Sequence, residues 1–400
     1  MKVAPLAGSS VSGHYRALDG VRGLAAVLVV LLHAEWPNHI TNNRFVQNGY
    51  LAVDLFFILS GLVIASNYSA RIADVRDLQR FGCLRFFRLY PLHLALLVAF
   101  VVLECAKLGA EHLLGVAPGG QAPFTHDSSL PALAANLFLV QGLHVLHRTT
   151  WNGPSWSISC EFAAYLAFGL AVLTGATRRR RFYAIGVLLA ASGYAALVIA
   201  RGSLDVQADW GVVRCFAGFF IGMLIFELTP KGALRLSRRL AATCEIAVVG
   251  AALLTMSLAP GRSIVIIIPL FALAVVLLQS DSGPVGRLLS TQPAQYLGRI
   301  SYSIYMVHDL LVVSLLIVLK RIFVAPLGIN SLRTHPVVMI NPWIGDLLVI
   351  GLLFSVLATA TLTYTFIEDP GRRFGRRLAD RLRTPHSDHA PGRSLAVRAE

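Results

Sequence analysis

Apolar residues occur in ten long runs along the 400-residue chain, and short polar or charged segments separate these runs. Each run is close to the roughly 20 residues that a helix needs to cross the hydrocarbon core of a bilayer. We therefore predict an all-α polytopic membrane protein, a bundle of about ten transmembrane helices. The predicted spans are 18–36, 49–69, 88–108, 157–174, 183–200, 211–228, 243–259, 263–280, 302–323 and 343–366.

The first run has an ionisable residue near each end. Arg22 and His33 are separated by ten residues that carry no charge. Eleven steps along an α-helix bring the second side chain to within about 20° of the first and raise it by about 16 Å, so both face the same direction. Ionisable side chains inside a membrane usually face a protein interior or a water-filled cavity. We therefore expect the other helices to surround this stripe.

Two apolar segments have an alternative to being an ordinary membrane span. AEWPNH follows the first run in place of a small-residue cleavage site, so we interpret that run as a retained span and not as a signal peptide. The run 133–145 is short and contains Asn136 and Gln141. A crossing there would force the arginines 178–181 to the outside. We interpret 133–145 as a re-entrant or interfacial segment at the outer face.

Two carboxylates are predicted at the depth of His33. The second and fourth spans both run from outside to inside, and Asp54 and Glu161 lie early in them. A carboxylate can hold a histidine in the tautomer that takes up a proton, as in hydrolase triads. His33, Asp54 and Glu161 are therefore catalytic candidates. The alternative is that the two carboxylates form a buried polar pair that locks helix packing, with His33 as a packing residue.

The inner half of the bundle is predicted to be cationic. Arg85 and Arg88 are three residues apart on one helix face at the inner end of the third span. Together with Arg22 they could bind phosphate groups. Taken singly, these arginines are also typical of positively charged membrane anchors. The ninth span adds Tyr302, Tyr305 and His308, which we interpret as lining residues on the same side.

Composition and charge agree with a membrane protein. Hydrophobic residues make up 56% of the chain, charged residues make up 14%, and the mean hydropathy is +0.65. The net charge of +14 would suggest nucleic acid in a soluble protein, but here its distribution over the loops is the informative property. The predicted inner loops hold 26 Lys and Arg residues and the outer loops hold five. We therefore expect both termini in the cytoplasm and no nucleic-acid partner.

The chain divides into three predicted parts. Residues 1–14 form a cytoplasmic segment, 15–373 form the membrane domain, and 374–400 form a basic, disordered cytoplasmic tail that is attracted to membrane lipids. No internal repeat is evident. The five cysteines have no CxxC spacing, so neither a zinc site nor a disulfide framework is indicated, and we predict no bound metal or cofactor.

Six motifs in order resemble one family, the type-3 membrane acyltransferases. They extend from residue 15 to about 373, nearly the whole chain. The motifs are YRALDGVRGLAAVLVVLLHA, VDLFFILSGLVI, LRFFRLYP, WSISCEFAAYL, LGRISYSIYMVH and FIEDPGRR.

The resemblance implies an activity and assigns residues to it. Such enzymes acylate sugars of bacterial polysaccharides and related acceptors, so the expected reaction moves an acyl group, commonly acetyl, from acyl-CoA to a hydroxyl of a carbohydrate or lipid-linked glycan. The expected location is the bacterial inner membrane. The positions that match functional residues of the family are Arg22 and His33, Arg85 and Arg88, Asp54, and Glu161. His33 would be the general base, and a carboxylate would orient it. The arginines would bind the CoA phosphates, and Tyr302, Tyr305 and His308 would line the acyl-CoA site.

The main alternative is a proton-coupled transporter, since intramembrane His, Asp and Glu also form proton relays. Inverted repeats and paired broken helices would favour a transporter, and the sequence shows neither clearly. A scaffold without chemistry would leave the Arg22 to His33 stripe unexplained. The acceptor, the acyl chain length, the oligomeric state and the choice between direct transfer and an acyl-enzyme are not specified by the sequence.

Overall fold

The computed structural model describes residues 15–114, 122–229, 236–259, 261–280, 283–319 and 340–382. The predicted segment 1–14 and the part of the predicted tail after residue 382 lie outside these ranges. The long helices are α1 (Arg16–Leu32), α3 (Ala52–Tyr68), α4 (Val75–Leu114), α6 (Ser155–Leu173), α7 (Arg180–Arg201), α8 (Gly211–Leu228), α9 (Arg238–Leu258), α10 (Ile267–Leu278), α12 (Gln292–Leu319) and α13 (Pro342–Thr363). The shorter helical segments are α2 (Arg44–Gln47), η1 (Asn48–Leu51), η2 (His126–Ser128), α5 (Leu130–Leu137), η3 (Gln141–Val145), η4 (Ala176–Arg178), η5 (Gly261–Ile266), α11 (Pro284–Leu289), η8 (Tyr364–Glu368) and α14 (Asp369–Arg381).

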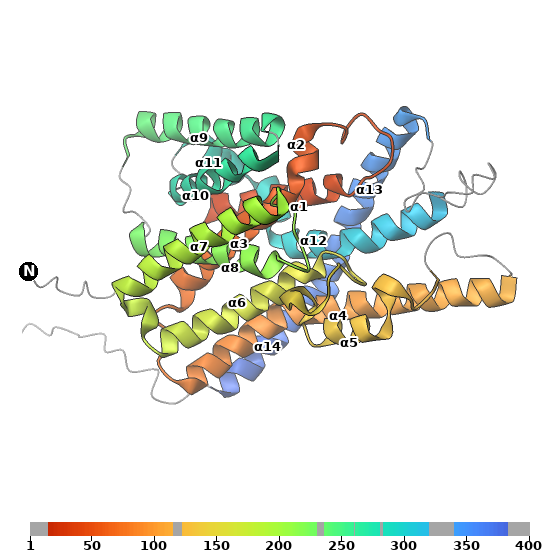
Figure 1. The fold of residues 1–400 in the computed structure, drawn as a ribbon, viewed down its shortest axis with the longest axis horizontal. Coiled ribbons are helices and arrows are strands. Elements are labelled where there is room, and N and C mark those ends of the chain that lie inside the picture. The colour runs from red at the N-terminus through yellow and green to blue at the C-terminus, as the bar shows by residue number, and fades with distance from the viewer. Residues whose placement is uncertain are drawn as a thin grey trace, which may run out of the picture.

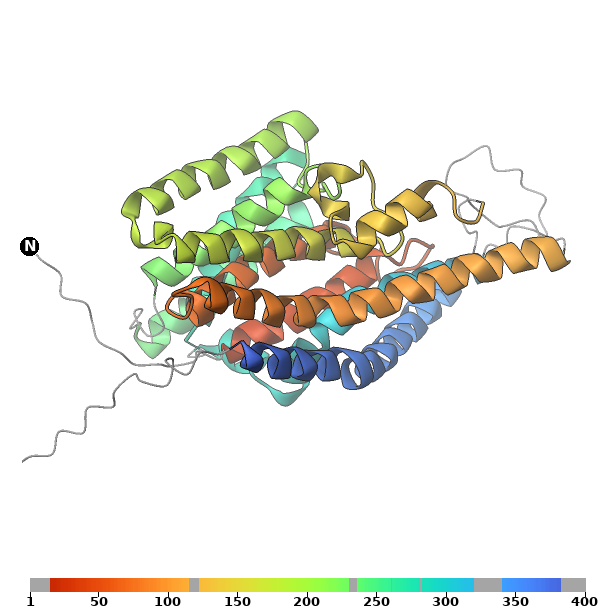
Figure 2. The ribbon, with the colours of Figure 1, turned by 90° about the horizontal axis from the view of Figure 1, so that it is seen from below.

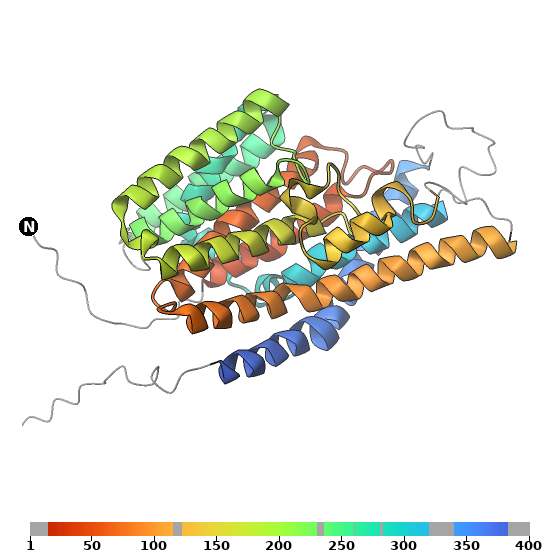
Figure 3. The ribbon, with the colours of Figure 1, turned by 60° about the horizontal axis from the view of Figure 1, so that its bottom comes forward.

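The prediction of an all-α bundle of about ten spans is confirmed. Eight helices of the described part are long and apolar enough to cross a membrane. The two remaining predicted spans coincide with α1, which has 17 residues, and with the shorter apolar helix Ile264–Leu278. Figure 3 shows α6, α7 and α8 side by side, with the long α4 below them. The chain is therefore a multi-pass membrane protein.

Glycines set the distances between the central helices. A Cβ on Gly23 of α1 would lie 2.6 Å from the backbone nitrogen of Gly298 in α12, and a Cβ on Gly61 of α3 would lie 1.9 Å from the carbonyl oxygen of Phe219 in α8. Small residues allow membrane helices to pack with their backbones in contact. These contacts fix α1 against α12 and α3 against α8, and so fix the side chains that these helices carry.

The segment 133–145 is helical but does not cross the bundle. It contains the end of α5 and the single-turn η3, which are joined through Leu139 with a positive φ of 55°. Both helices are too short to span a bilayer. Gly142 packs against the carbonyl oxygen of Trp156 at the start of α6. The structure supports the interpretation of 133–145 as a segment that does not cross.

The chain stays ordered beyond the boundary predicted at residue 374. Residues 374–381 continue α14, which lies along the first part of α4 in Figures 2 and 3. Gly371, Gly375 and fully buried Ala379 are four residues apart, so they form one face of small residues, and Gly375 packs closely against the ring of Phe87. The prediction that disorder begins at 374 is wrong for this stretch, because basic composition concealed a packing face.

The two ends of the bundle separate the loops as the charge analysis predicts. The turn between α6 and α7, the start of α4 and the end of α14 lie at the left in Figure 1, and the far end of α4 and the start of α13 lie at the right. All three segments at the left carry clusters of arginine. The positive-inside rule would place this end in the cytoplasm.

A labelling experiment tests this orientation. In a cysteine-free background, we expect an impermeant thiol reagent to label Ser128→Cys from outside intact cells and to leave Thr177→Cys unlabelled, because the two half-buried positions lie at opposite ends. Permeabilised cells serve as the control, in which both positions react. Labelling of Thr177→Cys alone in intact cells would invert the topology.

Candidate active site

His33 ends α1, and its own helix fixes its tautomer. The ring Nδ1 lies 2.8 Å from the carbonyl oxygen of Val29, one turn earlier. Because a carbonyl oxygen can only accept a hydrogen bond, Nδ1 carries a proton, and in the neutral ring the lone pair is therefore on Nε2. A neutral imidazole with a free Nε2 is the form that takes a proton from a hydroxyl group.

His308 of α12 lies beside His33. The two ring centroids are 4.7 Å apart with an angle of 61° between the ring planes. His308 is fully buried and donates Nδ1–H to the carbonyl oxygen of Tyr305 at 2.7 Å, and its Nε2 has no partner among the described residues. From its place in the ninth predicted span, His308 was expected to line the inner, acyl-CoA-binding side together with Tyr302 and Tyr305. The structure places it with the candidate base instead.

Asp54 is not brought to His33. Its carboxylate accepts hydrogen bonds from Arg214 of α8 at 2.7 and 2.9 Å and from the hydroxyl of Tyr194 of α7 at 3.1 Å. The side chains of Asp54 and Arg214 are 0% and 1% exposed. Asp54 was expected beside His33 because both lie at a similar depth in the membrane. Its side chain instead faces α7 and α8. Arg214 is a residue that sequence reasoning missed, although an arginine inside a predicted span is itself a signal of a buried partner.

Glu161 of α6 is also not within hydrogen-bond distance of His33. Its Oε1 accepts a short hydrogen bond from the hydroxyl of Ser60 of α3 and a second from the hydroxyl of Tyr165 at 2.5 Å. Ser60 and Tyr165 contact each other at 3.0 Å. Neither hydroxyl was identified from sequence, although Ser60 stands in the motif FFILSG and Tyr165 is one turn from Glu161.

A cavity of about 130 Å³ contains this group. Its lining includes all three predicted arginines together with Ser60, Glu161 and Tyr165. On α12 the lining includes Ser301, Tyr302 and Tyr305, but His308, one turn farther along the same helix, does not line the cavity. On α1 it includes Arg22 but not His33. The cavity therefore ends one helical turn before the histidine pair.

Two tyrosines of α12 form walls of this cavity. Tyr302 donates to the carbonyl oxygen of Leu89 at 2.6 Å, and the guanidinium of Arg88 lies 5.8 Å from its ring centroid. Tyr305 donates to the carbonyl oxygen of Pro154 at 3.2 Å and packs edge to face against Phe56, with ring centroids 5.7 Å apart. Tyr305 also lies next to His308, with ring centroids 6.0 Å apart. Phe56 and Tyr305 thus form the end of the cavity nearest the histidine pair.

The three predicted arginines have different partners. Arg22 pairs with Asp19 at 2.5 Å, Arg85 donates to the hydroxyl of Tyr68 at 2.8 Å, and Arg88 pairs with buried Glu368 at 2.7 Å. The Nε groups of Arg22 and Arg85 are buried without a partner among the described residues. Both side chains therefore keep a charged donor for a ligand in the cavity that they line.

A second cavity, of about 320 Å³, shares Arg22 and Arg88 with the first. Its other lining residues are Asp19, Gln295, Arg299, Tyr364 and Arg372. Four guanidinium groups and the Asp19 carboxylate line it, and the buried Glu368 carboxylate pairs with Arg88 and Arg372 at 2.7 and 3.8 Å, so the local charge is still positive and favours anions. Arg299 and Arg372 were not candidates from sequence, because single arginines at span ends look like membrane anchors.

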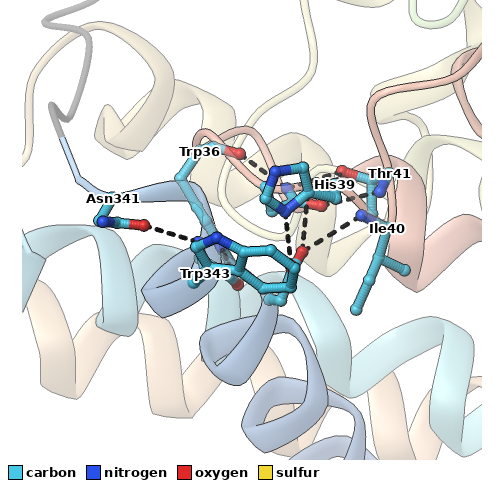
Figure 4. Close-up of polar contacts among 9 residues, drawn as sticks. Trp36, His39, Ile40, Thr41, Asn341 and Trp343 are labelled. Carbon is cyan, nitrogen blue, oxygen red and sulfur yellow. Dashed lines mark hydrogen bonds and ion pairs between the residues drawn. The ribbon is translucent and has the colours of Figure 1, made fainter.

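The loop after His33 is held to the start of α13, as Figure 4 shows. His39 contacts Asp346 through its backbone N–H at 2.7 Å and its ring Nδ1 at 2.8 Å, and it packs against Trp343 with ring centroids 4.6 Å apart. Trp36 donates its indole N–H to the carbonyl oxygen of Gly345 at 3.0 Å. These contacts cover the end of α1 on the side opposite the arginines.

Comparisons with known proteins agree on one family. The family model described as an acyltransferase domain matches residues 15–365. BcsY of Komagataeibacter xylinus, which bears the name membrane-bound transacylase, is 28% identical over 298 residues, covering 73% of this chain and 72% of BcsY. The acyltransferase MdmB of Streptomyces mycarofaciens is 36% identical over 166 residues, covering 38% of each chain.

The O-acetyltransferase OatA of Staphylococcus aureus is 22% identical over 388 residues, covering 90% of this chain and 57% of OatA. The chain thus aligns with less than two thirds of the length of MdmB and of OatA. No solved structure matches the chain.

Proposed function

This chain belongs to the acyltransferase family whose domain matches it, and from that premise we propose that its donor is acyl-CoA and its acceptor a hydroxyl of a carbohydrate or lipid-linked glycan. Membership of this family makes the chain a membrane O-acyltransferase and decides against the transporter alternative. The donor, the acceptor and the roles of individual residues are the proposal.

The observation that carries the proposed donor is the pair of cavities that share Arg22 and Arg88. CoA carries a diphosphate between its adenosine and pantetheine parts and a third phosphate on its ribose, and guanidinium groups bind phosphates with two parallel hydrogen bonds. We assign the phosphates to the larger cavity, where Arg299 and Arg372 add two further cations. The thin arm that carries the acyl group would enter the smaller cavity and bring the thioester toward Glu161.

The state of His33 supports its role as general base. Its Nδ1–H donates to the carbonyl oxygen of Val29, so in the neutral ring Nε2 is the nitrogen that can take the proton of an acceptor hydroxyl. The proposed role of Asp54 in orienting His33 is not supported by its contacts, since Arg214 and Tyr194 occupy its carboxylate. Asp54 is better explained as a structural anchor between α3 and α8.

The proposed location is a bacterial inner membrane with both termini in the cytoplasm. The arginine-rich loops gather at one end of the bundle, and the four-arginine cavity includes Arg372 of α14, which also ends there. Acyl-CoA is a cytoplasmic metabolite, so the donor cavity and the positive-inside rule favour the same orientation. BcsY, MdmB and OatA all come from bacteria.

A donor-binding experiment tests the function. With purified protein in detergent and acetyl-CoA as donor, we expect Arg22→Ala to raise the KM and the Kd for acetyl-CoA by about 10- to 100-fold while kcat is largely retained. Loss of one charge-assisted hydrogen bond costs about 1.5–3 kcal/mol, and about 1.4 kcal/mol corresponds to a tenfold change. An interaction made equally in the ground state and the transition state changes KM and not kcat.

Arg148→Ala is the matched control, since this arginine is exposed, pairs with Asp127 and lines neither cavity. It should bind and turn over acetyl-CoA normally. If the unaltered protein neither binds acetyl-CoA nor hydrolyses or transfers its acyl group, the proposed donor is wrong.

A further inference from the structure

The hydroxyl groups that line the smaller cavity differ in the acceptors of their hydrogen bonds. Six hydroxyl side chains from the described residues line it: Ser60, Ser157, Tyr165, Ser301, Tyr302 and Tyr305. Four of them donate to backbone carbonyl oxygens, at distances from 2.6 to 3.2 Å. Only Ser60 and Tyr165 donate to a carboxylate, that of Glu161. A carboxylate can take up a proton from a hydroxyl, whereas an amide carbonyl cannot.

Ser60 is the more accessible of these two hydroxyls. Tyr165 is 5% exposed, and its ring packs between Phe81 and Phe219, with centroids 6.4 and 6.0 Å away. Ser60 is only partly buried. A group that attacks a thioester must be reached by it, so Ser60 is the better placed nucleophile. Tyr165, bound to the same carboxylate oxygen, is placed to orient Glu161.

The position of Ser60 is fixed by the packing of α3. Its neighbour Gly61 lies against the backbone of α8, and a Cβ on Gly222 of α8 would lie 2.0 Å from the carbonyl oxygen of Ile58. The two backbones therefore cannot shift apart or rotate without losing these contacts. The position of Ser60 is therefore fixed by a rigid helix pair and not by a loop, and its partner Glu161 lies on a third helix, α6.

We propose that Ser60 is the first acceptor of the acyl group and forms a transient O-acyl-serine, with Glu161 as its general base. This inference rests on the proposed acyl-CoA donor. In the first step Ser60 Oγ bonds to the thioester carbonyl carbon and its proton passes to Glu161. The carbon–sulfur bond then breaks, and the departing CoA sulfur takes that proton.

The second step regenerates the serine. The acceptor hydroxyl gives its proton to His33 and attacks the ester carbon, the bond to Ser60 Oγ breaks, and the proton taken up by His33 is returned to Ser60 Oγ. Arg85, whose Nε has no partner among the described residues, lines the same cavity and provides positive charge for the oxyanion that forms in each step. Glu161 and not His33 is the base for the first step, because Glu161 lines the cavity that holds Ser60 and His33 does not.

The experiment looks for the carrier in the absence of acceptor. Purified protein is incubated with acetyl-CoA labelled in the acetyl group, quenched in acid and digested, and the label is located by mass spectrometry. We expect the label on Ser60 in the unaltered protein and in His33→Gln, and no label in Ser60→Ala. In Glu161→Gln the labelling rate should fall by about 10²- to 10⁴-fold, since the general base is removed.

Ser66→Ala is the matched control on the same helix, because Ser66 donates to the carbonyl oxygen of Val63 and does not line the cavity. It should be labelled like the unaltered protein. Binding of acetyl-CoA by each variant shows that the donor site is intact. Label on Tyr165 or His33, or full acyl transfer by Ser60→Ala, would overturn the role of Ser60 and leave the donor proposal standing. Absence of both acetyl-CoA binding and transfer in the unaltered protein would overturn both.

Discussion

Replacing Arg214 by methionine should lower the free energy of unfolding by about 3–5 kcal/mol. The guanidinium is 1% exposed and makes five hydrogen bonds, three to Asp54 and two to the backbone carbonyl oxygens of Tyr50 and Val206. Its removal leaves the Asp54 carboxylate buried, with the Tyr194 hydroxyl as its one remaining side-chain donor among the described residues. A buried charge that has lost its partner is among the most destabilising changes known in proteins.

Thermal unfolding in detergent, followed at several denaturant concentrations, measures this loss. The double variant Arg214→Met, Asp54→Leu should recover most of the stability, because neither charge is then buried. Arg201→Ala is the control, since it removes only an exposed ion pair with Asp209 at 4.0 Å and should cost about 0–1 kcal/mol. If Arg214→Met lowered the free energy of unfolding no more than Arg201→Ala does, water would have to reach the Arg214–Asp54 pair.

Replacing His33 by glutamine should lower kcat by about 10²- to 10⁴-fold with little change in acetyl-CoA binding. Glutamine can make the hydrogen bond to Val29 that His33 makes, but an amide cannot take up a proton at neutral pH. His33 lines neither cavity, so acetyl-CoA should bind as before.

His93→Gln is the control for this prediction. His93 is fully buried, whereas His33 is half-buried, and one ring nitrogen of His93 contacts the carbonyl oxygen of Asn136 at 2.9 Å while the other has no partner in the described part of the chain. His93→Gln makes the same substitution at a site outside the proposed chemistry, so kcat should be unchanged if the variant folds. Normal turnover of well-folded His33→Gln would move the base for the acceptor step to another residue, with Glu161 the next candidate.

Several site features could be predicted without a structure because they depend on one helix at a time. Arg22 and His33 face the same neighbour: Arg22 shares its cavity with Ser301 of α12, and His33 contacts His308 of α12. Helical periodicity is enough to predict this. The inner arginines were predictable for a similar reason, since their spacing and their position at a span end both follow from the local sequence.

The partners of the two carboxylates, Asp54 and Glu161, could not be predicted in this way. Asp54 and Glu161 were expected beside His33 because all three lie in the same half of the membrane. Depth follows from counting residues along a span, but the direction of a side chain around the bundle depends on which helices are neighbours. Asp54 faces Arg214 and Glu161 faces Ser60, and no local pattern specifies either contact.

The sequence alone therefore determined the number of long helices, the end of the bundle that carries the arginines and the stripe on α1. Hydropathy and charge bias act on each segment through the bilayer, so they can be evaluated segment by segment. Only the tertiary structure decided that the Glu161 cavity stops short of the histidine pair and that Asp54 belongs to Arg214. These outcomes depend on contacts between helices far apart in the chain, such as Gly61 against Phe219 and Gly23 against Gly298, which fix the rotation of each helix about its axis.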